Sequence, residues 1–145
     1  MRAETSGRFK RIVWPMAIAQ TLLWAGVYYL FPALLNAWEQ NLGWSRTELL
    51  GAFTVALLLS ALIAPEVGRQ IDKGRSDIVF LVSTMASGVL LAALTQITAL
   101  WQFYLVWGML GIAMAGSLYE CCFAILTRYM GARTREAITL VTLLA

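Results

Sequence analysis

The uncharged run from Ile78 to Tyr119 limits what this chain can fold into more than any other feature of its sequence. A single helix of its roughly 40 residues would be about 60 Å long, twice the roughly 30 Å of hydrocarbon in a bilayer. The run therefore has to fold back on itself, and its polar cluster, Thr95 to Thr98, marks the turn. This interpretation predicts two membrane-spanning helices, 78–97 and 100–126.

Two further apolar segments are long enough to cross a membrane, and they predict helices over 12–36 and 47–67. A fifth helix is expected to begin near Ala137 and to be incomplete, over 137–145. Hydrophobic residues make up 60% of the chain and its mean hydropathy is +0.71, outside the usual range of a soluble domain. We therefore expect an all-α membrane protein whose first partner is the lipid bilayer.

The basic residues are distributed unevenly between the two sides of the expected membrane. Of the 11 Lys and Arg residues, Arg46 alone falls in a loop on one side, and the others lie in the segments 1–11, 69–75 and 128–135. Because positive loops stay inside, these three segments are expected to be cytoplasmic in a multi-pass protein of the cell membrane. This asymmetry also accounts for the net charge of +3, so a nucleic-acid partner is not expected.

Side chains typical of enzyme chemistry are scarce. The chain has no His and no nucleophile or phosphate-loop signature, and Cys121 and Cys122 are adjacent, without the spacing of a metal site. We expect these cysteines to be packing residues. The chain is expected to be neither an enzyme nor a cofactor- or metal-binding protein.

Charge is concentrated in the stretch G-R-Q-I-D-K-G-R-S-D, Gly68 to Asp77, between the second and third helices. It resembles the loop signature of the major facilitator superfamily, roughly G-x-x-x-D-[RK]-x-G-[RK], with one spacer residue fewer. The matching residues are Gly68, Asp72, Lys73, Gly74 and Arg75. In that family the loop latches two halves of a transporter together, which implies close helix contact at the first glycine and a hydrogen-bonding role for the aspartate. The alternative is an ordinary loop, because D-[KR]-G turns are common.

Two more stretches resemble bacterial transporters related to the monocarboxylate porters. They are G-W-S-R-T-E-L before the second helix and L-Y-E-C-C-F-A-I-L-T-R-Y-M-G-A-R-T-R-E-A around the fourth. The resemblance implies an N-terminal fragment of a secondary transporter, part of one six-helix half, whose partner is a missing C-terminal half. It also implies that the first and fourth helices line a central solute cavity.

Glu120 is the one acidic residue expected inside a span and not in its polar flanks. An ionised side chain at mid-bilayer costs about 2.5–3.5 kcal/mol, so such residues usually face a water-filled cavity or a partner and often mark proton pathways. On a regular helix it shares a face with Gly116 and other small residues. Two interpretations stay open: a substrate or proton-pathway residue, or a structural ion pair with Arg128 or another helix.

Gln20, Trp24 and Tyr28 recur every four residues on the first helix and form a polar and aromatic stripe at mid-span. We expect the stripe to face Glu120 across the solute path. Aromatic packing against neighbouring helices is the alternative. Pro32 is expected to kink the outer end of the same helix.

Two function classes follow. The first is a secondary transporter of a small organic solute, with a carboxylate among the candidates, working by alternating access and coupled to protons as in symport. The second is a small four-helix membrane protein with a structural or partner-binding role. The sequence does not identify the solute.

Overall fold

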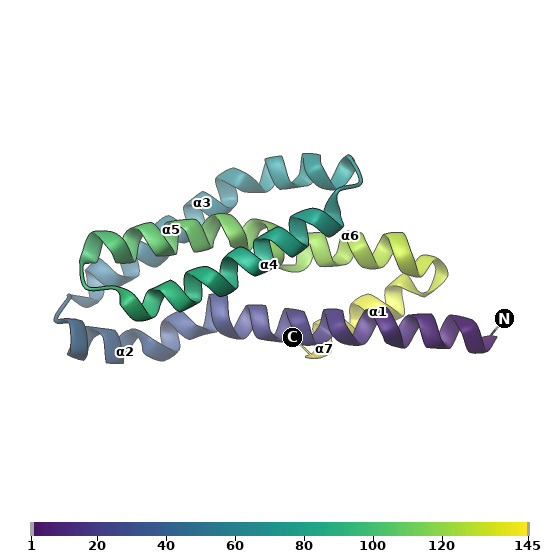
Figure 1. Ribbon diagram of the computed structural model, residues 1–145, viewed down its shortest axis with the longest axis horizontal. Helices are drawn as coiled ribbons and strands as arrows, with labels where there is room; N and C mark the ends of the chain where they lie inside the picture. Colours follow the sequence, from purple (N-terminus) through teal and green to yellow (C-terminus); the bar gives the residue numbers. More distant parts are fainter. Residues whose placement is uncertain (1, 145) are drawn as a thin grey trace.

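Long helices account for nearly all of the described residues, 2–144, in the computed structural model (Figure 1). Four helical segments are long and apolar enough to cross a membrane, which indicates a membrane-embedded protein: Phe9–Leu42, Arg46–Asp72, Ser76–Gln96 and Leu100–Leu144. The first three correspond to single expected spans, and the last includes both the fourth span and the fifth helix. Met1 and Ala145, which belong to the expected segments 1–11 and 137–145, lie outside the described residues.

The first span consists of three consecutive helical elements. It is helical from α1 (Arg2–Leu23) through a π-helical segment (Trp24–Tyr29) to α2 (Leu30–Leu42). The segment expected before this span, 1–11, is thus helical from Arg2 onward.

Short connections join the next helices. The second span, α3 (Arg46–Asp72), begins with a capping box: Ser45 Oγ accepts from the Glu48 amide, and the Glu48 carboxylate accepts from the Ser45 amide. The third, α4 (Ser76–Ala93), ends in a 3₁₀ turn (Leu94–Gln96), where the turn at Thr95 to Thr98 was predicted. The predicted turn is therefore confirmed.

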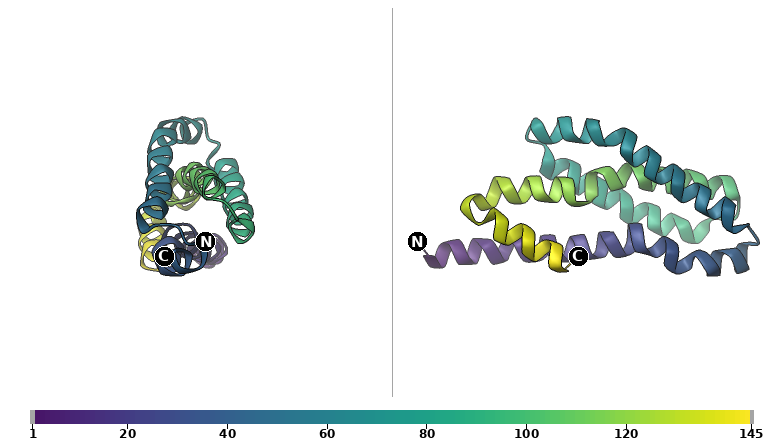
Figure 2. Two further views of the ribbon diagram at one scale, coloured as in Figure 1. Left: turned by 90° about the vertical axis from the view of Figure 1, so that its left-hand side faces the viewer. Right: turned by 180° about the vertical axis from the view of Figure 1, so that it is seen from behind.

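The remaining helices depart from the predicted boundaries. The segment 100–126, expected as one helix, is divided into α5 (Leu100–Ser117) and α6 (Tyr119–Met130) by a break at Leu118. A 3₁₀ turn (Gly131–Arg133) then leads to α7 (Thr134–Leu144), which packs beside α1 (Figure 2). Figure 1 shows the connections before α3 and α5 at one end of the bundle. The N-terminal end, the α3–α4 connection and the α6–α7 turn lie at the other, so the three basic segments share one end.

Hydrophobic packing forms separate clusters along the bundle. The largest joins α2, α3 and α5 near the end that carries Arg46, around the fully buried Trp107 and the stacked rings of Phe31 and Phe53, whose centroids are 4.5 Å apart. A second cluster joins α1, α6 and α7 at the basic end. By contrast, α4 exposes a stripe of large apolar side chains, as expected of a helix that faces lipid: Ile78, Leu81, Val82, Met85 and Val89.

Candidate site between the first and fourth spans

The fourth span is interrupted at Leu118, whose ψ of −159° is extended. The sequence explains the break locally, because Gly116 and Ser117 form a Gly/Ser pair of the kind at which helices kink. In addition, the Ser117 hydroxyl donates to the Ala113 carbonyl at 2.8 Å, a back-bond that often bends helices. The helix ends at this pair and restarts at Tyr119.

Gln20 of α1 supplies hydrogen bonds to the backbone where the fourth span is interrupted. Its side chain is fully buried, and Nε2 donates to the Ser117 carbonyl at 3.0 Å and to the Leu118 carbonyl at 3.4 Å. The Ser117 carbonyl belongs to the last turn of α5, where the helix no longer supplies a partner. Irregular backbone at membrane depth is tolerated where it is buried in protein or lines a cavity, and Leu118 satisfies the second condition.

The π-helical segment of the first span lies next to this break. Pro32 follows the segment and has no N–H to bond the Tyr28 carbonyl one turn earlier. The distortion expected near Pro32 is therefore a π segment on its N-terminal side, and π segments frequently occur at functional sites. It carries Trp24 and Tyr28, whose rings meet edge to face with centroids 5.3 Å apart.

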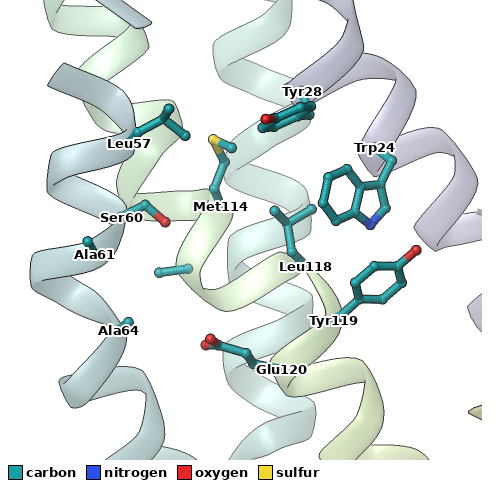
Figure 3. Close-up of a pocket in the computed structure, with 11 residues that line it drawn as sticks. Trp24, Tyr28, Leu57, Ser60, Ala61, Ala64, Met114, Leu118, Tyr119 and Glu120 are labelled. Carbon is teal, nitrogen blue, oxygen red and sulfur yellow. The ribbon is translucent and has the colours of Figure 1, made fainter. Parts of the chain in front are cut away.

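A cavity of about 370 Å³ lies between these two irregular segments and α3 (Figure 3). Trp24 and Tyr28 line it from the first span, and Leu118, Tyr119 and Glu120 line it from the break and the start of α6. On α3 the lining side chains are mostly small, which leaves room in the middle: Leu57, Ser60, Ala61 and Ala64. Three of the five predicted pathway residues thus lie around one cavity.

Glu120 projects from the first turn of α6 toward the α3 wall of this cavity (Figure 3). It is exposed to the cavity, and no hydrogen bond or ion pair joins it to another described residue. Arg128, the partner considered for a structural ion pair, instead donates from Nη1 to the Gly74 carbonyl at 2.8 Å. The geometry therefore offers no support for a Glu120–Arg128 pair.

The two other predicted pathway residues lie outside the cavity lining. Gly116 is buried against α4, where a Cβ atom would collide with the Ser83 hydroxyl. It therefore serves the contact between α4 and α5. The predicted common face of Gly116 and Glu120 is wrong because the break at Leu118 interrupts the helical register between them. Gln20 supports the break instead of lining the cavity.

The α3–α4 loop has a local explanation. Gly74 has φ +76° and donates to the Ile71 carbonyl, while the Arg75 amide donates to the Gln70 carbonyl. This pattern is a Schellman motif, in which glycine follows the helix end. The D-K-G-R sequence therefore ends helix α3. This role agrees with the alternative interpretation, in which the stretch is an ordinary loop.

Two parts of the latch interpretation have no counterpart among the described contacts. Asp72 is exposed and accepts no hydrogen bond from a described residue, and Lys73 is likewise exposed. At Gly68, where close helix contact was expected, a Cβ atom would meet nothing within 4 Å. Contact with α6 comes from the Gly74 carbonyl and from Asp77, whose Oδ2 accepts from the Tyr129 hydroxyl at 2.7 Å.

Residues that sequence reasoning missed include Leu118 and Ser60. The Gly116–Ser117 pair was the available signal for the break. Ser60 gave no signal, because a lone serine on an apolar helix is common. Cys121 and Cys122 are free and buried in hydrophobic clusters. Within residues 2–144, no group of three or more His, Cys, Asp or Glu side chains is placed to hold a metal ion.

Comparison with known proteins adds no assignment. No protein-family model, curated protein or solved structure matches the chain.

Proposed function

We propose that this chain is part of a secondary transporter that moves a small organic solute across a membrane. The observation that carries the proposal is the pairing of two irregular helix segments, the π turn Trp24–Tyr29 and the break at Leu118, around one cavity. Interrupted helices that surround a site near mid-membrane are a recurrent feature of transporters, because the freed backbone and the cavity together admit polar solutes.

The unpaired carboxylate of Glu120 supports the same function. A carboxylate inside a span that lacks a protein partner is expensive unless it faces water, a solute or a proton. Placed on the cavity, it can exchange a proton with the water that fills the cavity in each state of the cycle. We propose that Glu120 couples solute movement to protons.

The resemblance to the major facilitator superfamily supports a division into two halves. On this proposal the cavity is completed by a C-terminal half, and alternating access moves that half against the helices described above. The shared end of the three basic segments supports a cytoplasmic location for the α3–α4 and α6–α7 connections.

The orientation can be tested with single cysteines at two exposed positions, Lys73 and Gln96, in a background that lacks Cys121 and Cys122. A membrane-impermeant thiol reagent applied to intact cells should label the cysteine at position 96 and not that at 73. The reverse pattern would invert the proposed orientation.

Transport can be tested in vesicles reconstituted with the complete transporter and loaded with a pH-sensitive dye. Pools of organic anions, cations and neutral solutes are added outside, and proton flux is recorded. One solute class should drive a flux that Glu120→Gln abolishes while solute exchange persists. Glu66 lies on α3 and already bonds to Arg69 and Gln70, so Glu66→Gln is a matched control that should retain the flux. Absence of both flux and exchange for every pool would favour the small structural protein.

A further inference from the structure

The charges and rings around the cavity restrict the solute class. Glu120 carries the one charge among the described residues that line it, and no Lys or Arg side chain is there to oppose it. An anionic solute in this space would meet an unopposed carboxylate. A cationic solute would supply the partner that the protein itself leaves out.

Aromatic rings from the π-helical segment and the start of α6 form another wall of the cavity. Trp24 lies between Tyr28 and Tyr119, with ring centroids 5.3 Å and 5.1 Å away. The Trp24 indole nitrogen is directed toward Tyr119 in Figure 3 and has no hydrogen-bond partner among the described residues. Faces of Trp and Tyr attract ammonium groups through the ring quadrupole, and aromatic cages of this kind recognise quaternary ammonium ligands.

Ser60 adds a polar group on the opposite wall. Most hydroxyls inside the helices donate to a carbonyl of their own helix, as Thr54 does to Leu50 and Ser87 to Ser83. The half-buried Ser60 hydroxyl has no such bond and projects into the space that the Glu120 carboxylate also enters (Figure 3). It is therefore free to accept a hydrogen bond from an ammonium N–H.

We infer that the cavity binds a small organic cation of the ammonium class, with Glu120 as its counter-ion, Trp24 and Tyr28 as its aromatic wall and Ser60 as a hydrogen-bond acceptor. The volume, about 370 Å³, is at the lower end of the roughly 300–1,000 Å³ typical of small-molecule sites, which suits a ligand of one ring or a short chain. This inference deepens the proposed function and rests on it. It replaces the carboxylate solute that the family resemblance suggested.

The test is equilibrium dialysis of the complete transporter in micelles of an uncharged detergent, with radiolabelled phenyltrimethylammonium as the probe and benzoate as the anionic counterpart. The cation should bind saturably, and benzoate should neither bind nor displace it. Glu120→Gln should weaken cation binding by about tenfold or more, because the bound cation loses its counter-ion. Glu66→Gln, the matched control, should bind like the unmodified chain.

Two further variants keep the test decisive if Glu120→Gln fails to fold, which circular dichroism would reveal. Trp24→Leu should weaken binding of the cation several-fold. Ser60→Ala should weaken binding of a primary ammonium probe, benzylammonium, more than that of phenyltrimethylammonium, which has no N–H.

The inference would be overturned if the Glu120, Trp24 and Ser60 variants all bound both cations as tightly as the unmodified protein does. Tighter binding of benzoate than of the cation would also overturn it, yet would leave the transporter proposal standing. Failure of transport with intact cation binding would instead count against the proposed function alone.

Discussion

The contact between α3 and α5 and the contact between the first span and α6 use opposite kinds of packing. Where α3 crosses α5, Gly111 lies directly against the backbone of Ala56, so closely that a Cβ atom would collide with it. Ala56 and Leu110 are fully buried there. Around the cavity, by contrast, Glu120 lacks a partner and the Gln20 Oε1 atom is buried without one, as far as the described residues extend.

This difference separates a rigid contact from an adaptable one. Helices in a bilayer associate through close van der Waals contact between small residues, and such contacts leave little freedom. Regions with irregular helices and incompletely satisfied polar groups are less stable locally, and moving elements are drawn from such regions. We therefore expect α3 and α5 to behave as one unit, against which α1 and α6 can shift.

The largest expected effect comes from adding one methyl group to the rigid contact. Gly111→Ala should lower the free energy of unfolding by about 3 kcal/mol, because the new Cβ forces the two backbones apart. Gly88 is the control: a Cβ there meets nothing within 4 Å, so Gly88→Ala should be neutral or stabilise the helix by up to about 1 kcal/mol. The midpoint of unfolding in mixed micelles measures the change in stability for both variants. Equal effects at the two glycines would show that the α3–α5 contact is not rigid.

An intermediate effect is expected at the break. Gln20→Leu should cost about 1–2 kcal/mol, because the Ser117 and Leu118 carbonyls lose their buried donor. Hydrogen exchange at the Leu118 to Glu120 amides should accelerate more than exchange in α3. Gln96→Leu, on the exposed turn, is the control and should change stability by less than about 0.5 kcal/mol. If exchange rises uniformly along the chain, Gln20 acts on global stability and not on the break.

The smallest expected effect is at Glu120 itself. Because it has no partner among the described residues, Glu120→Ala should change the unfolding midpoint little, within the range of ordinary surface substitutions. Glu48→Ala should lower the midpoint measurably, since that carboxylate accepts from both the amide and the hydroxyl of Ser45. A large loss of stability at Glu120 would revive the structural ion-pair interpretation, with a partner outside the described contacts.

Properties set by composition along the chain were predictable. The four apolar segments, the turn near Thr95 and the capping box at Ser45 all depend on residues within one or two helical turns of each other. Helix length against bilayer thickness and local capping chemistry decide such features. Spacing likewise predicted the stripe of Trp24 and Tyr28, whereas its direction toward the fourth span was an implication of the family resemblance.

Tertiary contacts decided the rest of the site. The Gly116–Ser117 pair permits a break, but Gln20 stabilises it from 97 residues away in sequence, and no periodicity in either segment encodes that hydrogen bond. Likewise, whether Glu120 pairs with Arg128 depended on where the α3–α4 loop lies, because the Gly74 carbonyl takes the Arg128 donor. The sequence alone determined which segments are long and apolar enough to cross a bilayer, since hydrophobic transfer acts on each segment separately. The tertiary structure decided which polar groups stay unpaired, since that depends on every partner within a few ångströms.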